Sequence, residues 1–575
     1  MMNKKNRIRL LSVICLCIIN LLYMHNYVIL TCQVEDVVDW TSWVDNICRV
    51  CFDVWFIFTC FYLLTKGKIS LSVCFTFCLT LLWSFFNVVY SRFFYHYISL
   101  SSIGETGALS DPLVFNSVIA GLRWADLFFP LMIILFVGLY RGLHINISGM
   151  FYAKKSVVCL GLLLFIDLFS HLLFCSLDPS LRHVKYYERR VGMRLFGNNF
   201  LLALPVYANF HNGTIKSLAI EAFGSLQGDI EITNEQVILI EEALRESEKS
   251  LIRQKRANIH NVIIIFVESY MSFVTDMIAD GKEVTPYLNA LKRDSTVYYN
   301  GKIKPNIAMG ESADGQYILM TGMLPLRSLI TISKAHKKPL PSLVKSLRQD
   351  GINDSRMILP TSSSLWKQDD MCKQYGFSHL YASNDYRGVH EQTLTDKQVF
   401  EMAINFDRNS KSKRFFSIIL TATMHQPYNK IVDHSYVIND ISLTSEMKSY
   451  LNVCHYTDNC IGEYLESLKE LNLYNNSLIV ITADHHAHNA DFGDNVSSEI
   501  PLFIINGGID DTAYHGACNQ VDIYTTIVDV LGLRNVWPGL GYSLLNSNYK
   551  DSVTPLKWDV SELLLLSDFF ANKNY

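Results

Sequence analysis

The chain has 575 residues and a formal net charge of −4. Hydrophobic residues make up 50% of it and charged residues only 18%, with a mean hydropathy of +0.17. This composition is too apolar for an ordinary soluble protein, and the length exceeds what a single core usually supports. The near-neutral charge lacks the concentrated basic character of nucleic-acid-binding proteins. We therefore expect a membrane protein with at least two structural units and no nucleic-acid partner.

Five apolar segments are long enough to cross a hydrocarbon core of ~30 Å. They lie near residues 8–30, 47–65, 69–90, 123–141 and 155–176. Lysines and arginines before the first segment, between the second and third, and between the fourth and fifth all fall on one side, which the positive-inside rule makes cytoplasmic. An odd number of spans then delivers the chain after about residue 177 to the extracytoplasmic (periplasmic) face of the cell (inner) membrane.

These patterns divide the chain into four parts. We predict a transmembrane domain at residues 1–178, a juxtamembrane connector at 179–257, a globular domain at 258–548 and a C-terminal tail at 549–575. The connector ends in a charge-rich helical pattern, for which a surface-lying amphipathic segment and a plain linker helix are equal alternatives.

Three continuous apolar runs in the globular part have the β-branched composition of strands that are buried on both faces. They cover residues 261–267, 415–420 and 477–483, and helical patterns lie between them, as at 340–348 and 447–468. Alternating strands and helices predict a doubly wound α/β domain with a mostly parallel sheet. Such a sheet binds ligands at the carboxyl ends of its strands.

Side chains that can hold a metal follow each of these three runs. Glu268 follows the first, His425 comes shortly after the second, and Asp484 and His485 follow the third. A carboxylate after a strand is often only a helix N-cap. Its repetition at several strand ends favours a site for a divalent ion such as Zn²⁺ or Mn²⁺.

A candidate hydroxyl lies between the first and second runs. The segment 310–316 reads Gly-Glu-Ser-Ala-Asp-Gly-Gln and leads into an apolar helical pattern. This arrangement places Ser312 at a helix N-terminus, where backbone N–H groups and the helix dipole favour an anion. A plain serine N-cap is the commoner explanation of this motif taken alone.

Taken together, the order of these motifs resembles the sulfatase/alkaline-phosphatase superfamily. The order is Glu268 after a strand, Gly310-x-Ser312-x-Asp314, His425-x-Pro427, Asp484-His485 after a strand, and the segment 520–527. With five spans before the domain, the chain resembles the lipoteichoic acid synthase and phosphoglycerol transferase branch of bacterial envelope enzymes. The resemblance implies an α-helical membrane domain followed by an extracytoplasmic sulfatase-like catalytic domain.

The resemblance also implies roles for individual residues. The family's metal ligands are matched by Glu268, Ser312, Asp484 and His485. Ser312 also takes the place of the nucleophile, which is usually a threonine. His425 matches a histidine that contacts the headgroup phosphate, and it could also move a proton. Trp366 matches a tryptophan of the substrate pocket, with a buried core tryptophan as an equal alternative.

The implied reaction needs one divalent metal ion, Mn²⁺ or Zn²⁺, with Mg²⁺ as a further candidate. The activated hydroxyl of Ser312 attacks a phospholipid donor, forms a covalent phospho-headgroup enzyme and releases diacylglycerol. A hydroxyl of an envelope glycan or lipid acceptor then takes the phosphoglycerol or phosphoethanolamine group. Gln368 stands where glycerol-phosphate transferases tend to carry arginine, so the headgroup stays open.

Two alternatives belong to other classes of function. A sulfuric- or phosphoric-ester hydrolase would use the same fold, but sulfatases need a Cys/Ser-x-Pro-x-Arg context, and Ser312 is followed by Ala-Asp-Gly-Gln. A catalytically inactive envelope-binding protein would have lost a metal ligand, whereas all four positions hold competent residues. A transferase is therefore the preferred hypothesis.

Overall fold

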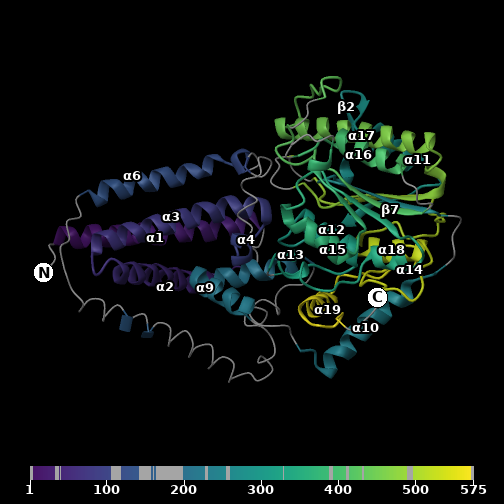
Figure 1. Cartoon of the computed structure of the whole chain (residues 1–575). Coiled ribbons are helices and arrows are strands. Elements are labelled where there is room, and N and C mark those ends of the chain that lie inside the picture. Colours follow the sequence, from purple (N-terminus) through teal and green to yellow (C-terminus); the bar gives the residue numbers. More distant parts are fainter. Residues whose placement is uncertain are drawn as a thin grey trace. The chain divides into compact units, whose positions relative to one another are not determined.

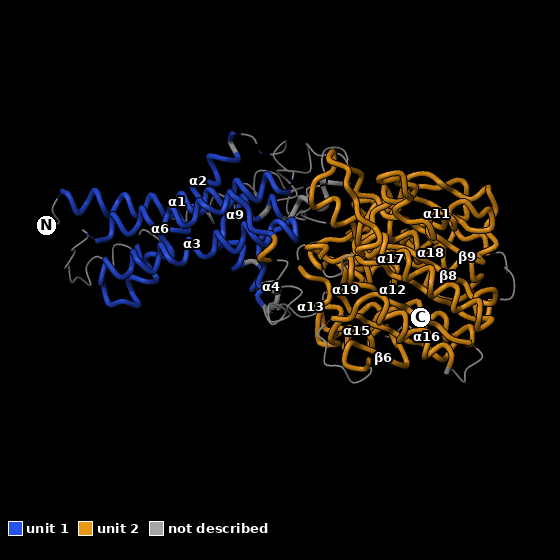
Figure 2. The backbone as a smooth tube through the Cα atoms, turned by 90° about the horizontal axis from the view of Figure 1, so that it is seen from above, with its two compact units in different colours: residues 1–103, 121–227 blue, residues 104–120, 228–575 orange. Residues whose placement is uncertain are grey.

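The structure is a computed structural model, shown in Figure 1. It describes residues 4–32, 38, 40–104, 115, 118–141, 157–158, 161–162, 198–226, 231–253 and 259–571, apart from gaps at 328, 387–392, 410–413, 430–432, 488–491 and 493–495. The chain forms two compact units, coloured separately in Figure 2. Unit 1 comprises residues 1–103 and 121–227, and unit 2 comprises residues 104–120 and 228–575.

Unit 1 is helical. Its described helices are α1 (Lys4–Thr31), α2 (Trp40–Leu64), α3 (Ile69–Phe94), α4 (Leu100–Gly104), η3 (Trp124–Leu127), α6 (Phe128–Tyr140) and α9 (Asn198–Leu226). Three of them contain segments that are long and apolar enough to cross a membrane, at Lys4–Thr31, Ser42–Leu64 and Ile69–Phe94. These match the first three predicted spans. A shorter apolar helix, Trp124–Tyr140, occupies the fourth.

The fifth predicted span, residues 155–176, lies almost wholly outside the described residues. The number of spans and the side on which unit 2 lies therefore stay predictions.

Charged side chains buried in unit 1 have partners there. Asp53 accepts the backbone N–H groups of Thr214 and Ile215 at 2.6 and 3.2 Å, just after α9 is interrupted at Gly213. Arg92 pairs with Asp126, with a guanidinium nitrogen and a carboxylate oxygen 2.5 Å apart. Ionisable side chains inside helical bundles are usually retained with such partners, either an opposite charge or backbone groups.

Unit 2 is built on an eight-stranded sheet with the order β10-β4-β9-β8-β1-β7-β5-β6. Its strands are β1 (Asn261–Val267), β4 (Tyr298–Lys304), β5 (Asp354–Ile358), β6 (His379–Tyr381), β7 (Phe415–Leu420), β8 (Ser477–Ala483), β9 (Ile500–Ile505) and β10 (Cys518–Asn519). All neighbouring pairs are parallel except those of β9, which runs antiparallel to β4 and β8. The prediction of a mostly parallel sheet is confirmed, and the three predicted runs are β1, β7 and β8.

Helices cover both faces of this sheet, as expected of a doubly wound fold. Figure 1 shows α11 (Pro286–Arg293), α16 (Asp396–Asn409) and α17 (Ser445–Glu470) on one face, with α12 (Ser312–Thr321), α14 (Leu343–Gln349), α15 (Gln368–Tyr375) and α18 (Val521–Val530) on the other. The remaining elements are α10 (Asn234–Ser250), α13 (Ile332–Ala335), α19 (Pro555–Leu566), a β2–β3 hairpin (Ile278–Ala279, Lys282–Glu283), and the 3₁₀ helices η5 (Ser272–Val274), η6 (Leu365–Lys367), η7 (Ser383–Asp385) and η8 (Tyr474–Asn476).

The strand order brings distant segments to one edge of the sheet. β1 lies between β7 and β8, and every residue of these three strands is buried. Because the three strands are parallel, the residues that follow them emerge side by side. β4 is separated from β8 by β9 and runs in the same direction as β8. Ser312 follows β4 in the chain.

Candidate active site

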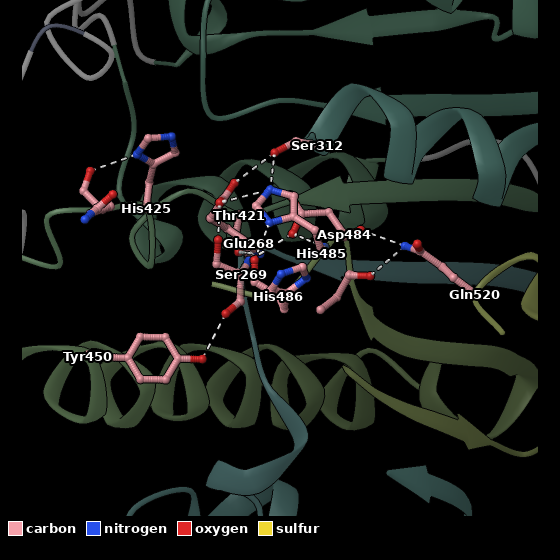
Figure 3. Close-up of polar contacts among 12 residues, drawn as sticks. Glu268, Ser269, Ser312, Thr421, His425, Tyr450, Asp484, His485, His486 and Gln520 are labelled. Carbon is pink, nitrogen blue, oxygen red and sulfur yellow. Dashed lines mark hydrogen bonds and ion pairs between the residues drawn. The ribbon is translucent and has the colours of Figure 1, made fainter. Parts of the chain in front are cut away.

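Three ligand-type side chains meet at the carboxyl ends of β1 and β8, as Figure 3 shows. Glu268, Asp484 and His485 are all buried, and their ligand atoms lie within 4.8 Å of one another. His485 Nε2 is 3.7 Å from Glu268 Oε1 and 3.5 Å from Asp484 Oδ2. Two carboxylates and an imidazole at this spacing are a donor set that suits Zn²⁺ or Mn²⁺.

The hydroxyl of Ser312 lies against this cluster. Ser312 is the first residue of α12, and its Oγ is 3.0 Å from His485 Nε2 and 3.4 Å from Glu268 Oε2. His485 Nδ1 lies 2.8 Å from the carbonyl oxygen of His486, to which it donates its proton. In the neutral imidazole this bond places the proton on Nδ1 and the lone pair on Nε2, as a metal ligand or a proton acceptor requires.

The cluster concentrates negative charge in a buried place. Burial and the neighbouring Glu268 carboxylate raise the pKa of Asp484 to about 6. Burial alone would lower the pKa of His485, but the carboxylates of Asp484 and Glu268 outweigh it and raise that pKa to about 9. A divalent cation would relieve the repulsion between the two carboxylates, so the residues present fit a metal ion.

Backbone and hydroxyl groups orient the two carboxylates. Asp484 Oδ1 accepts the N–H groups of Ser269 and His485, each at 2.8 Å. The Ser269 hydroxyl donates to Glu268 Oε1 at 2.6 Å, and the N–H of Glu268 donates to the hydroxyl of Thr421 at 3.0 Å. Ser269 and Thr421 lie next to strand ends, so the strand pattern could have identified them.

Tyr450 supports the loop after β1 from a different part of the chain. It lies on α17, and its hydroxyl accepts the N–H of Met271 at 3.0 Å and donates to the carbonyl oxygen of Ser269 at 2.9 Å. Figure 3 shows the ring on the helix beneath the cluster. No sequence signal distinguishes Tyr450 from the other aromatic residues of this helix.

Close packing explains the glycines around Ser312. The Asp314 carboxylate accepts the N–H groups of Gly310 and Ala308 at 2.8 and 3.0 Å, and a Cβ on Gly310 would lie 2.3 Å from Asp314 Oδ1. A Cβ on Gly315 would lie 2.4 Å from the carbonyl oxygen of Asp484. At both positions a larger residue would therefore force neighbouring atoms to shift.

Glu311, immediately before the serine, was not identified from the sequence. Its φ of 47° and ψ of −124° are unusual for a residue with a side chain. Strained backbone of this kind persists where the surrounding structure holds it, often at functional sites. Burial raises the pKa of Glu311 to about 8, and its electrostatic interactions with His485 and Asp484 place this carboxyl close to the cluster.

The other two predicted site residues are not among the three clustered ligand side chains. Figure 3 shows His425 to one side, with its Nδ1 2.9 Å from the carbonyl oxygen of Gln426. Trp366 lies in η6, after β5, with a φ of 51°, and is partly buried against the core of unit 2. β5 and β7 are neighbours, so both residues follow strands that end at this edge of the sheet. Their roles in headgroup binding stay predictions.

Comparisons with known proteins identify relatives of the part of the chain that carries this site. Residues 260–533 match the family model described as Sulfatase. Lipoteichoic acid synthase 2 of Bacillus subtilis (strain 168) is 26% identical over 297 residues, which are 48% of this chain and 45% of that protein. Lipoteichoic acid synthase of Staphylococcus aureus (strain USA300) is 23% identical over 407 residues, 70% of this chain and 60% of that protein. The chain thus spans about half the length of these curated relatives.

Solved structures with partial similarity to this chain were also found. One is the crystal structure of the lipoteichoic acid synthase LtaP from Listeria monocytogenes, with a TM-score of 0.44 and 17% identity over 53% of this chain and 81% of that one. The family match begins at β1, ends after α18 and encloses all six residues singled out above. Residues 260–533 are therefore a domain that matches the Sulfatase family model, and lipoteichoic acid synthases are among the curated relatives of the chain.

Proposed function

We propose that this chain is a metal-dependent, membrane-anchored phosphotransferase. It would move a phosphoglycerol or phosphoethanolamine headgroup from a phospholipid donor to an envelope glycan or lipid acceptor. The observation that carries this proposal is the hydroxyl of Ser312, 3.0 Å from His485 Nε2, at a buried group of two carboxylates and one imidazole. The relation to lipoteichoic acid synthases supports the same class of chemistry.

Glu268, Asp484, His485 and the Ser312 hydroxyl would hold the metal. A bound Mn²⁺ or Zn²⁺ lowers the pKa of an attached hydroxyl and stabilises charge on phosphoryl oxygens. In the first step, Ser312 Oγ bonds to phosphorus as the bond to the diacylglycerol oxygen breaks, and diacylglycerol leaves with a proton. In the second, the oxygen of an acceptor hydroxyl bonds to phosphorus as the bond to Ser312 Oγ breaks, and the proton lost by the acceptor restores the Ser312 hydroxyl.

His425 and Trp366 would act on the headgroup. His425 follows β7, next to the strand that carries Glu268, and an imidazole there can supply the proton that the leaving diacylglycerol needs. Trp366 would contact the headgroup from the end of β5. The proposed transfer requires no nucleotide, because the lipid phosphodiester is already the activated donor.

Intact-mass spectrometry of the purified full chain in detergent tests the chemistry. The chain is incubated with Mn²⁺ or Zn²⁺ and with either phosphatidylglycerol or phosphatidylethanolamine. An adduct with the mass of one headgroup, present in the wild type and in Ser312→Thr but absent in Ser312→Ala, is the expected result. A metal-loaded wild type that forms no adduct with any lipid would contradict headgroup transfer.

The proposed location is tested separately. Unit 2 should be cleaved when a protease is added to right-side-out spheroplasts, because we place it on the extracytoplasmic face. Complete protection in intact spheroplasts, with cleavage after lysis, would place it in the cytoplasm and refute the topology.

A further inference from the structure

The nucleophile and its metal site come from strands that are not neighbours. Ser312 follows β4, whereas Asp484 and His485 follow β8, and β9 lies between these two strands. Because β9 is antiparallel to both, its carboxyl end leaves at the opposite edge of the sheet. Backbone pairing of β4 with β8 therefore cannot set the distance between the hydroxyl and the ligands.

The side chain of Gln520 connects the segment that follows β4 with the segment that follows β8. Gln520 precedes α18 and is only 1% exposed. Its Nε2 donates to the carbonyl oxygen of Asp484 at 2.6 Å, and its Oε1 accepts the N–H of Asn306 at 3.1 Å. Figure 3 shows Gln520 reaching Asp484 from the side away from His425. The opposite orientation of the amide would set oxygen against oxygen, so the partners fix it.

Both sides of this bridge are anchored. The N–H of Gln520 donates to the carbonyl oxygen of Lys304 at 2.9 Å, at the end of β4. A second hydrogen bond joins the same two segments, because Asn306 Oδ1 accepts the N–H of Val521 at 3.1 Å. The start of α18 and the segment that leads to the nucleophile are thus held as one piece.

Hydrogen bonds and close packing also connect this segment to Ser312. Asp314 binds the N–H groups of Ala308 and Gly310, which lie between Asn306 and Ser312. Gly315, in the first turn of α12, packs against the same Asp484 carbonyl oxygen that Gln520 binds. A displacement at Gln520 is therefore transmitted to Ser312 through backbone hydrogen bonds and close contacts.

We propose that Gln520 is a positioning residue, which sets the distance between Ser312 Oγ and the ligand atoms of Asp484 and His485. The inference rests on the proposed function only in taking Ser312 as the nucleophile of a metal site. Gln520 touches neither metal nor substrate. Its effect is steric: a misplacement of about 1 Å at a reacting centre costs about 100-fold in rate.

The first test uses a readout that contains no lipid. The full chain carrying Ser312→Cys is titrated with Co²⁺, and a thiolate-to-cobalt charge-transfer band reports that the side chain at position 312 reaches the metal. The spectrum of the chain that keeps Ser312 is subtracted, because the sequence contains 14 other cysteines. Adding Gln520→Met, which keeps the side-chain length and loses the hydrogen bonds of the amide, should reduce the saturated band severalfold.

Asn506 offers a matched control. Its amide donates to the carbonyl oxygens of Tyr474 and Ser477 at 2.7 and 2.9 Å, at the opposite edge of the same sheet. Gln520→Glu and Asn506→Asp each replace an amide donor by an acid facing a carbonyl oxygen. Both variants should lower the melting temperature. Gln520→Glu should weaken the cobalt band, whereas Asn506→Asp should leave it unchanged. Equal bands in all variants would overturn the positioning role.

The second test measures the rate of the Ser312 adduct per metal-loaded molecule. Gln520→Met should slow it by about 10- to 100-fold, and by more than it weakens metal binding. A rate that falls only in proportion to the folded fraction would show that Gln520 merely stabilises the fold. Failure of the wild type to form an adduct would count against the proposed function alone, because the cobalt band decides the role of Gln520 independently.

Discussion

Replacing Tyr450 by phenylalanine isolates what one hydroxyl contributes to the candidate metal site. The ring, which packs against Tyr428 and Phe492, is kept. The hydrogen bonds of the hydroxyl to Met271 and Ser269 are lost. Ser269 holds Asp484 through its N–H and Glu268 through its hydroxyl, so the loop that orients both carboxylates loses its support.

The structure sets the size of the effect. Tyr450, Met271 and Ser269 are 0%, 3% and 5% exposed, so water cannot replace the lost hydroxyl without rearrangement. A buried N–H left without a partner costs about 1–3 kcal/mol, and the second bond contributes about 1 kcal/mol. The free energy of unfolding should fall by about 2–4 kcal/mol. Loss of groups that orient metal ligands typically lowers metal affinity by about 10- to 100-fold, and we expect about tenfold.

Competition with a chromogenic chelator for Zn²⁺ measures the affinity of the full chain in detergent. Tyr464→Phe is the matched control, because Tyr464 lies on the same helix, is 2% exposed and donates to Asp407 at 2.8 Å. The control should lose stability and keep its metal affinity. Unchanged affinity in Tyr450→Phe, or an equal loss in both variants, would refute the reasoning.

Three further changes have defined outcomes. Asp484→Asn should lower metal affinity by more than about 100-fold, since losing outer groups alone costs 10- to 100-fold; the chelator assay measures it, and near-normal affinity would rule out Asp484 as a ligand. Gly315→Ala should lower both the melting temperature and the adduct rate, because its Cβ would lie 2.4 Å from the Asp484 carbonyl oxygen; normal values of both would contradict that packing. Burial raises the pKa of Asp407 to about 6, although the Tyr464 hydroxyl donates a hydrogen bond to its carboxylate. The folded state therefore binds a proton at Asp407 more tightly than the unfolded state does. The free energy of unfolding should therefore fall as pH rises from about 4 to about 6, and Asp407→Asn should flatten this slope in urea titrations; an unchanged slope would show that Asp407 titrates normally.

The sequence alone predicted the centre of the sheet. β1, β7 and β8 are strands whose two faces are both buried, so each is a continuous apolar run that can be read locally. The first three membrane helices are visible for a similar reason, because a span must be apolar over its whole length. β4 gave no such signal: it alternates buried and exposed residues and contains Asn300 and Gly301.

The motif residues were also visible in the sequence, but their distances were not. Glu268, Ser312 and Asp484 are far apart along the chain, and the strand order that brings them together is not the chain order. Packing between distant segments decides that order, because each strand must bury both faces against helices that come from elsewhere.

The supporting residues depended on the tertiary structure most of all. Tyr450 and Gln520 act through contacts with Ser269 and Asp484, and each contact joins segments that are separated by many residues. Neither a tyrosine inside a helix nor a glutamine just before one has a local feature that reveals its partner. The sequence by itself thus determined the candidate residues for the chemistry, whereas the tertiary structure decided which side chains hold them in place, because hydrogen bonds between distant segments exist only after the sheet has formed.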